Sequence, residues 1–301
     1  MSLQLVFDAA ALGGIYAVAA LGIALIFGVM KLVNFAHGQF IAFAVFALIV
    51  PSSDAVAVMG LGAAPAVVLV PAILLIGAGL AVAAEMVVFR PLRAASPVAL
   101  MVASFALGVV IQNLLLAVYG GRPKAISLWP ELGQPVAVLG ASVPLLQIIV
   151  IGAVLLILAV LAVMLRHSRI GLEMRAASED FGMARLLGVR SNAVISGAFA
   201  LSGALAAAVA LVLVAQTGVA DVRMGGQIML VAFIATVVGG MGSLAGAVAA
   251  GFAIGAVSVA LQAALPIEAR PFRDAFLYGL VIMVLLFRPQ GLFATAAKPR
   301  V

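Results

Sequence analysis

The sequence has no cysteine, two histidines and few charged residues, and each shortage narrows what the chain can be. Without cysteine it forms no disulfide and no thiolate metal site, and His37 and His167 alone do not predict a metal cluster. Charged residues make up 9% of the chain and hydrophobic residues 66%, whereas soluble domains are about 25% charged. The composition therefore predicts an all-α membrane protein with several spans and without a bound cofactor.

Nine apolar runs, separated by charged, proline or glycine residues, are candidates for membrane spans. They are residues 3–30, 40–50, 66–89, 98–118, 143–165, 192–216, 227–238, 244–265 and 275–287. A regular spanning helix needs about 20 apolar residues, so the runs at 40–50 and 227–238 are short and predict interrupted helices. We expect one transmembrane domain over residues 1–301 with eight or nine spans. The first run is longer than the core of a signal peptide and is expected to be retained.

Lysine and arginine collect on one side of these alternating spans. Eleven of the 16 basic residues lie there: Lys31, Arg90, Arg93, the five arginines between 166 and 190, Arg288, Lys298 and Arg300. The positive-inside rule makes this side cytoplasmic and places the N-terminus outside and the C-terminus in the cytoplasm. Because these residues lie in short gaps without a long basic face, the pI of 10.5 indicates membrane topology and not nucleic-acid binding.

Two polar interruptions, at residues 34–39 and 239–243, adjoin the two short runs. Non-helical backbone persists at membrane depth only where protein buries it or a water-filled cavity meets it, and broken helices in both halves of a chain indicate a transport site. We therefore expect a substrate path between the two breaks. Its candidate residues are Asn34, Phe35, His37, Gln39, Thr236, Gly239, Gly240, Gly242 and Ser243. Two alternatives remain: His37 as a helix cap or structural hydrogen bond, and residues 239–243 as a tight turn.

Two further features predict packing. Gly251 and Gly255 form a GxxxG pair, which favours close approach of two helices. Glu85 is a carboxylate inside an apolar run, five residues before Arg90. A carboxylate there is either functional or paired with nearby cations, and the structural hypothesis pairs Glu85 with Arg90 or Arg93.

The gap between residues 166 and 191 is too long for a simple hairpin and rich in helix-forming residues. From Ser178 onward it predicts a short amphipathic helix, with Ser178 as the N-cap and Gly188 as the C-terminal stop. Such a helix either rests on the membrane interface or, because its charges are mixed, contacts a protein partner. We favour the partner.

The gap also resembles the cytoplasmic loop of permease subunits of branched-chain amino acid ABC importers. The resemblance extends over nearly the whole chain, through stretches at residues 34–38, 85–93, 168–188, 239–243 and 288–293. In that family the loop carries a short coupling helix that docks onto an ATPase subunit. The residues that the resemblance assigns to this contact are Arg175, Glu179, Asp180, Met183, Ala184, Arg185, Leu186 and Gly188.

The resemblance implies a set of partners and a location. It implies two cytoplasmic ATPase subunits, a second permease as homodimer or heterodimer partner, a periplasmic substrate-binding protein, membrane lipid, and a place in the bacterial inner membrane. The substrate is implied to be a branched-chain amino acid or a related small amide or zwitterion. ATP hydrolysis is expected in the partners, because the chain has no GxxxxGK[ST] phosphate-binding motif.

Two other functions compete with a non-enzymatic permease. An ion-coupled secondary transporter of small amino acids or amides also uses broken helices, but Glu85 stands nearly alone as a carboxylate within the apolar runs. An intramembrane hydrolase would use Ser104 or Ser202 with His37, but no acid that would orient the base accompanies them.

Overall fold

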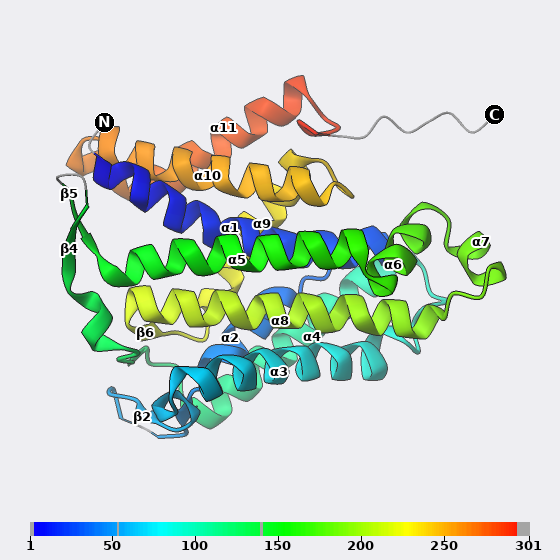
Figure 1. Ribbon diagram of the computed structural model, residues 1–301, viewed down its shortest axis with the longest axis horizontal. Coiled ribbons are helices and arrows are strands. Elements are labelled where there is room, and N and C mark those ends of the chain that lie inside the picture. The colour runs from blue at the N-terminus through cyan, green and yellow to red at the C-terminus, as the bar shows by residue number, and fades with distance from the viewer. Residues whose placement is uncertain (1–2, 53, 139–140, 294–301) are drawn as a thin grey trace.

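The computed structural model describes residues 3–52, 54–138 and 141–293 as an elongated helical bundle (Figure 1). Within these residues six helices are long and apolar enough to cross a membrane. They are α1 (Leu3–Met30), α3 (Ala66–Ala84) with its π-helical continuation η2 (Glu85–Phe89), α4 (Pro97–Tyr119), α5 (Leu145–His167), α8 (Ser191–Thr217) and α10 (Leu244–Ala264). The shorter helices are α2 (His37–Phe46), α6 (Arg169–Glu179), α7 (Phe181–Leu186), α9 (Met224–Gly239) and α11 (Arg273–Phe287).

Short strands and 3-10 helices occupy the connections. Three two-stranded antiparallel sheets pair β1 (Ile49–Val50) with β2 (Val58–Met59), β3 (Lys124–Ala125) with β6 (Val219–Ala220), and β4 (Pro135–Val138) with β5 (Ala141–Pro144). The 3-10 helices are η1 (Leu61–Ala63), η3 (Pro130–Gly133) and η4 (Ile267–Phe272). The prediction of a mostly helical membrane bundle is confirmed, but the connections are more ordered than an all-α fold implies.

The predicted boundaries of three runs are wrong. The second helix begins at His37 and not at residue 40, because the amides of Gln39 and Phe40 already donate to the carbonyl of Ala36. It also ends early, at Phe46. The seventh begins at Met224 and not at residue 227. The fifth begins at Leu145, because the two residues before it are paired in β5.

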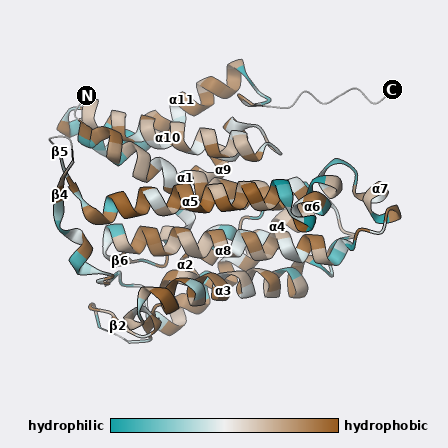
Figure 2. Ribbon diagram, in the orientation of Figure 1, coloured by the Kyte–Doolittle hydropathy of each residue, from teal (hydrophilic) through white to brown (hydrophobic). Residues whose placement is uncertain are grey.

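The bundle has two chemically different ends. The start of α1 lies with the β4–β5 hairpin at one end, which we call the hairpin end (Figure 1, left). The helices α6 and α7 project from the opposite end, which we call the α7 end (Figure 1, right). Hydrophobic residues cover the long helices between them, and hydrophilic residues gather around α6 and in the loops (Figure 2). The arginines of the predicted cytoplasmic side, Arg166 to Arg190 among them, belong to the α7 end; Lys298 and Arg300 lie outside the described residues.

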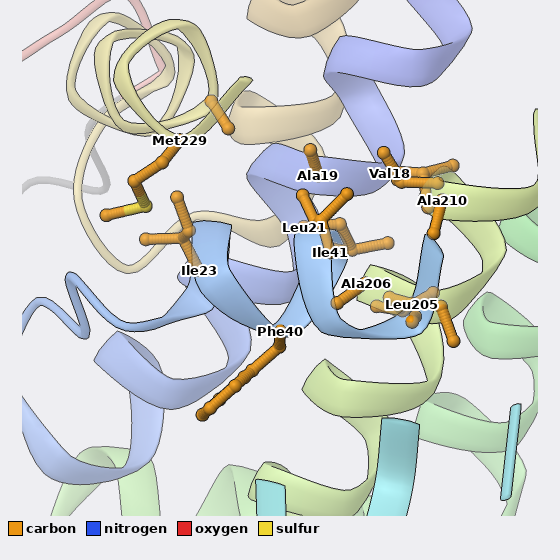
Figure 3. Close-up of a cluster of buried hydrophobic side chains, with 14 of the residues drawn as sticks. Val18, Ala19, Leu21, Ile23, Phe40, Ile41, Leu205, Ala206, Ala210 and Met229 are labelled. Carbon is orange, nitrogen blue, oxygen red and sulfur yellow. The ribbon is translucent and has the colours of Figure 1, made fainter. Parts of the chain in front are cut away.

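The short helix α2 lies inside the bundle. Nine of its ten residues are buried; it packs against α3, α4, α8 and α9, and the His37 ring lies against Gly22 of α1. Figure 3 shows Phe40 and Ile41 of α2 among side chains of α1, α8 and α9. The outer faces of α3, α4 and α5 instead expose large apolar side chains such as Leu75, Phe105 and Leu156. Apolar side chains on the outer faces are expected where lipid and not water surrounds the helices.

Glycine allows close contact between α1 and α10. The helix α1 runs antiparallel to α10, with Gly251 against Ala17 and Gly255 against Gly13. A Cβ atom built on Gly255 would collide with the backbone of Gly13, so no side chain can be accommodated unless the helices separate. The GxxxG prediction of close packing is therefore confirmed for this pair.

We expect Gly255→Ala to destabilise the protein by about 1–3 kcal/mol, the usual cost of overpacking a tight interface. The measurement is thermal unfolding of the purified protein in detergent. Gly152→Ala is the matched control, because Gly152 lies inside α5 and no atom lies within 4 Å of the position that an added Cβ would take. Equal melting temperatures for the two variants would contradict this account of the α1–α10 contact.

Candidate functional site

The first break comprises residues 31–39: a turn at 31–36, buried except at Lys31 and Phe35, and the first turn of α2. Asn34 is fully buried, and its Oδ1 accepts a hydrogen bond of 3.0 Å from the amide of Ala36. The amide of Phe35 donates to Oγ of Ser104 on α4, at 3.1 Å. Neighbouring protein therefore satisfies part of the freed backbone polarity, as a non-helical segment among apolar helices requires.

His37 points from the first turn of α2 into the space that glycine leaves on α1. Its ring lies against Gly22, and its Nδ1 is 3.0 Å from Oγ of Ser202 on α8. Both side chains are fully buried. Three polar atoms of this break have no hydrogen-bond partner among the described residues: Asn34 Nδ2, His37 Nε2 and Gln39 Oε1. The break thus combines packed surroundings with unused hydrogen-bonding capacity.

The helix α9 adjoins both breaks. Gly38 lies against Gly225 and Met229, and the rings of Phe35 and Phe233 are 6.0 Å apart between centroids. One turn after Phe233, Thr236 Oγ1 donates to the carbonyl of its own helix at Ala232, at 2.8 Å. Its second contact is the Ala20 carbonyl on α1, at 3.2 Å. Thr236 is therefore a polar link between α9 and α1.

The second break, residues 239–243, is a compact turn at the α7 end. Gly239 lies against Gly246, and Gly240 and Gly242 have φ angles of +97° and +99°, which glycine adopts without strain. Oγ of Ser243 caps α10 by accepting from the Gly246 amide at 3.0 Å. The requirements of a tight turn and a helix cap therefore explain the presence of the glycines and of Ser243 in this segment.

The segment after α11 closes over this turn. The amide of Leu292 donates to the carbonyl of Val238 at 2.7 Å, and Gly291 lies against Gly240. The structure thus brings the stretches at 239–243 and 288–293 together, although nearly fifty residues separate them in the sequence. The two breaks lie at different places along α9: the first contacts Gly225, Met229 and Phe233, and the second begins at Gly239, the last residue of the helix.

Two cavities lie along α1, at opposite ends. A groove of about 550 Å³ at the α7 end is mainly apolar and is lined by α1, α5, α6 and α10, with Gly242, Arg166 and Arg175 at its edge. A cavity of about 750 Å³ at the hairpin end is more polar. Neither includes residues 34–39, so in this conformation the first break is enclosed by packed side chains.

The predicted coupling loop contains two helices. Ser178 is not an N-cap, which corrects the prediction: it lies in α6, and its Oγ donates to the Arg175 carbonyl at 2.7 Å. Asp180 caps the second helix instead, because its backbone is extended and its Oδ1 accepts from the Met183 amide at 3.0 Å. Glu179 correspondingly ends α6 and does not begin α7.

Gly188 ends α7 as predicted. Its φ is +89°, its amide donates to the Arg185 carbonyl, and the Val189 amide donates to the Ala184 carbonyl. This pair of bonds is the Schellman arrangement that terminates helices at glycine. Of the remaining residues assigned to coupling, Ala184 is buried, Met183 and Leu186 are exposed, and Arg175 donates to the carbonyls of Leu165 and Arg166 at the end of α5.

Glu85 forms an ion-pair cluster, as the structural hypothesis predicted. Its side chain is fully buried, and it pairs with Arg90 at 2.8 Å and with Arg93. Ser196 Oγ donates to the same carboxylate at 2.9 Å, and Arg93 also reaches Asn192. The cluster joins the end of α3 to the beginning of α8.

Sequence reasoning missed the partner serines. Ser196 holds Glu85, Ser202 faces His37, and Ser104 holds the first break. The sequence indicated Ser104 and Ser202 only as candidate nucleophiles of a hydrolase. Their signal in the sequence, a single polar residue within an apolar run, does not identify the partner that each one meets.

Comparison with known proteins places these features in one family. The sequence profile described as "Branched-chain amino acid transport system / permease component" matches residues 5–285. The chain is 31% identical to the high-affinity branched-chain amino acid transport system permease protein BraD of Pseudomonas aeruginosa, over 96% of this chain and 95% of that protein. It is 29% identical to the corresponding LivH protein of Escherichia coli K12, over 96% and 94%.

A more distant relative covers part of the chain. It is the autoinducer 2 import system permease protein LsrC of Yersinia pseudotuberculosis, 32% identical over 58% of this chain and 50% of that protein. No solved structure gives a significant match.

We expect Glu85→Gln to lower the free energy of unfolding by about 2–3 kcal/mol, because two arginines and Ser196 lose a buried carboxylate. The arginine side chains are 35% and 23% exposed, and water screening keeps the loss at or below the lower limit of the range of about 3–5 kcal/mol for fully buried pairs. Thermal melting in detergent measures it. Glu268→Gln, which removes an exposed carboxylate from η4, is the control; a similar melting temperature for both would refute a stabilising role of the cluster.

Proposed function

Because the chain belongs to the family of branched-chain amino acid transport permease components, we propose that it is the membrane-spanning subunit of an ATP-driven importer. The proposed cargo is a branched-chain or related small amino acid, delivered outside by a periplasmic binding protein and released into the cytoplasm. The observation that carries the proposal is the family match over nearly the whole chain, in a protein with six helices suited to span a membrane within its described residues.

The proposed location is the bacterial inner membrane, with the N-terminus outside and the C-terminus in the cytoplasm. The distribution of charge supports this orientation, because the arginine-rich helices α6 and α7 lie at the end opposite to the start of α1 (Figure 1). Eight or nine crossings follow if α11 and one or both of the short helices α2 and α9 are counted with the six long helices. The proposed assembly contains a second permease subunit and two cytoplasmic ATPase subunits.

The coupling contact is proposed at α7. Two of its large apolar side chains and the adjoining Leu187 are exposed: Leu186 is 82% exposed, Leu187 79% and Met183 55%. Exposed apolar side chains next to Arg185 and Asp180 suit a protein partner whose surface buries them. Glu179 and Arg185 then lie at the rim of the contact, and Arg175 holds α6 against the end of α5.

The substrate path is proposed along α9, between the two breaks. The unpartnered polar atoms of Asn34, His37 and Gln39 support this placement, as does the aromatic contact of Phe35 with Phe233. Because these groups are packed in the present conformation, the path must open during the transport cycle. Thr236 and residues 239–243 belong to the same path and must move with α9.

The competing functions have less support. Glu85 is the one fully buried carboxylate among the described residues, and its oxygens are occupied by Arg90, Arg93 and Ser196, so it is not available for ion coupling. The Ser202–His37 pair has the spacing of a nucleophile and a base, but the described residues place no carboxylate on His37 Nε2.

We expect Leu186→Asp to abolish co-purification of the ATPase subunits and ATP-dependent uptake of L-leucine, because a charge would replace an apolar contact at the centre of the proposed interface. The assay is affinity purification of the tagged permease followed by uptake in proteoliposomes. Ile267→Asp is the matched control, since Ile267 is 75% exposed at the hairpin end. Retained ATPase and uptake in Leu186→Asp would disprove the contact.

We also expect Gly188→Val to uncouple ATP hydrolysis from uptake, because a β-branched residue does not adopt the φ of +89° that positions the end of α7. Gly188→Asn is the control, since asparagine tolerates this region best among residues with side chains. Ratios of substrate imported to ATP hydrolysed measure the effect. Equal ratios in both variants would show that the conformation of Gly188 is unimportant for coupling.

A further inference from the structure

The cavity at the hairpin end is a site that the preceding proposals leave unused. It has a volume of about 750 Å³ and lies between the ends of α1, α5, α8 and α10, next to η4. Its polar lining comes from five elements: Asp8 of α1, Gln147 of α5, Gln216 of α8, Gln262 of α10 and Arg270 of η4.

This convergence of polar side chains is specific. Asp8 is the sole charged residue of α1, Gln147 lies in the first turn of α5, and Gln216 and Gln262 lie in the last turns of α8 and α10. Asp8 and Gln147 are half-buried, and Gln216, Gln262 and Arg270 are exposed. Four helices direct a polar residue into the same cavity, which predicts a hydrated chamber for a polar ligand.

The two charges of the chamber do not neutralise each other. Asp8 Oδ1 accepts from Gln147 Nε2 at 2.8 Å and from Gln4 Nε2 at 3.3 Å, and no described residue bonds to its Oδ2. Arg270 donates through Nε to the Leu265 carbonyl at 3.4 Å, and its terminal nitrogens have no hydrogen bond among the described residues. The described ion pairs do not join Asp8 to Arg270.

The charges therefore complement a ligand that carries both signs. A carboxylate oxygen attracts an ammonium group, and a guanidinium with free terminal nitrogens binds a carboxylate through two parallel bonds. Leu5, Leu12 and Val259 supply apolar lining beside them. This combination matches a zwitterionic α-amino acid with an aliphatic side chain.

The chamber lies at the beginning of α1, where cargo that moves along this helix from the hairpin end would first meet it. The helix α1 packs against both α5 and α10, whereas α5 and α10 share no packed interface in the described part of the chain. The apolar groove at the α7 end lies along the same three helices. Ile15 and Val18 of α1 and Val154 of α5, which lie along these helices between the residues that line the two spaces, are buried.

We propose that this chamber is a receiving site for zwitterionic α-amino acids, in which Asp8 binds the ammonium group and Arg270 binds the carboxylate. The inference rests on the proposed function as an importer, because only import brings the amino acid from outside to the hairpin end first. It adds the site at which cargo first contacts this chain and the two charges that recognise it.

The first experiment measures binding without requiring transport. Because the chain has no cysteine, Ala263→Cys introduces a single thiol into the chamber lining. We expect saturating L-leucine to slow its reaction with a membrane-impermeant maleimide in the reconstituted complex. Isovalerate, which lacks the ammonium group, and isoamylamine, which lacks the carboxylate, should protect much less. Ala264→Cys, which is exposed but outside the chamber lining, is the control and should not be protected.

The second experiment measures uptake by the complete complex in proteoliposomes with its ATPase subunits and binding protein. We expect Asp8→Asn and Arg270→Gln to lower the maximal uptake rate by about tenfold or more, the size expected for loss of one charge-assisted hydrogen bond. ATP hydrolysis stimulated by the loaded binding protein should persist. Asp8→Glu and Arg270→Lys, which keep the charges, should recover part of the uptake.

Two control variants separate recognition from structure. Glu268→Gln and Arg122→Gln remove exposed charges at the hairpin end that do not line the chamber, and they should have no effect. A loss of uptake in these controls equal to that in Asp8→Asn would overturn the proposed recognition.

The remaining outcomes are also decisive. Equal protection of Ala263→Cys by all three probes, or by none, would overturn the receiving site even if the wild-type complex imports L-leucine. Loss of binding-protein-stimulated ATP hydrolysis in Asp8→Asn and Arg270→Gln would show that the chamber is a docking surface and would also overturn it. A wild-type complex that imports no amino acid would refute the proposed function, while the protection experiment would still decide the site.

Discussion

The structure depends on one constraint: a stretch of non-helical backbone must be hidden inside a bundle whose outer surface faces lipid. The turn at residues 31–36 exposes amides and carbonyls that no membrane lipid can satisfy. The bundle surrounds it, with Ser104 of α4 bonded to Phe35, and with α3, α4, α8 and α9 packed around the short helix α2 that follows. Glycine makes this enclosure possible, because Gly22 leaves room for the His37 ring and Gly38 allows contact with Gly225. The long helices α3, α4 and α5 then expose apolar faces because they surround this interior.

The same use of glycine determines where the cavities lie. The tight contact of Gly13 with Gly255 and of Ala17 with Gly251 fixes α10 against one side of α1, and Gly14 lies against Val154 of α5 on another side. With α1 filling the space between them, α5 and α10 do not close on each other, and the cavities open at both ends of this gap. Larger residues at these glycines would move α10 or α5 away from α1. The cavities are therefore consequences of the close packing behind them, not independent features of the loops.

Much of the fold could be predicted from the sequence, and the reason lies in the length of the apolar runs. The first run coincides with α1, Leu3–Met30, and the other long helices begin or end within a few residues of prediction, because an apolar run of about 20 residues is long enough to cross the hydrocarbon core as a helix. The predictions that failed depend on local hydrogen bonds, which hydropathy does not reveal. Ser178 was expected to cap a helix, but Asp180 does so, since its extended backbone brings the carboxylate to the Met183 amide. The arginine partners of Glu85 could be predicted, because Arg90 and Arg93 are near it in the sequence. The serine partners on α8 could not, because Ser196 and Ser202 are more than a hundred residues from Glu85 and His37.

The helix α5 connects the two ends of the molecule. At the α7 end Ser168 caps α6 directly after α5, and Arg175 of α6 returns to bond the last carbonyls of α5 at Leu165 and Arg166. The short segment between α5 and α6 is therefore fixed by hydrogen bonds and is not a loose hinge. At the hairpin end the same helix carries Gln147, which bonds to Asp8. A force applied to α7 by a partner reaches α6 and then α5, and a 23-residue helix transmits displacement along its axis because its backbone hydrogen bonds keep it stiff. The Gln147–Asp8 bond is then the point where such a displacement would alter the charge arrangement of the far cavity.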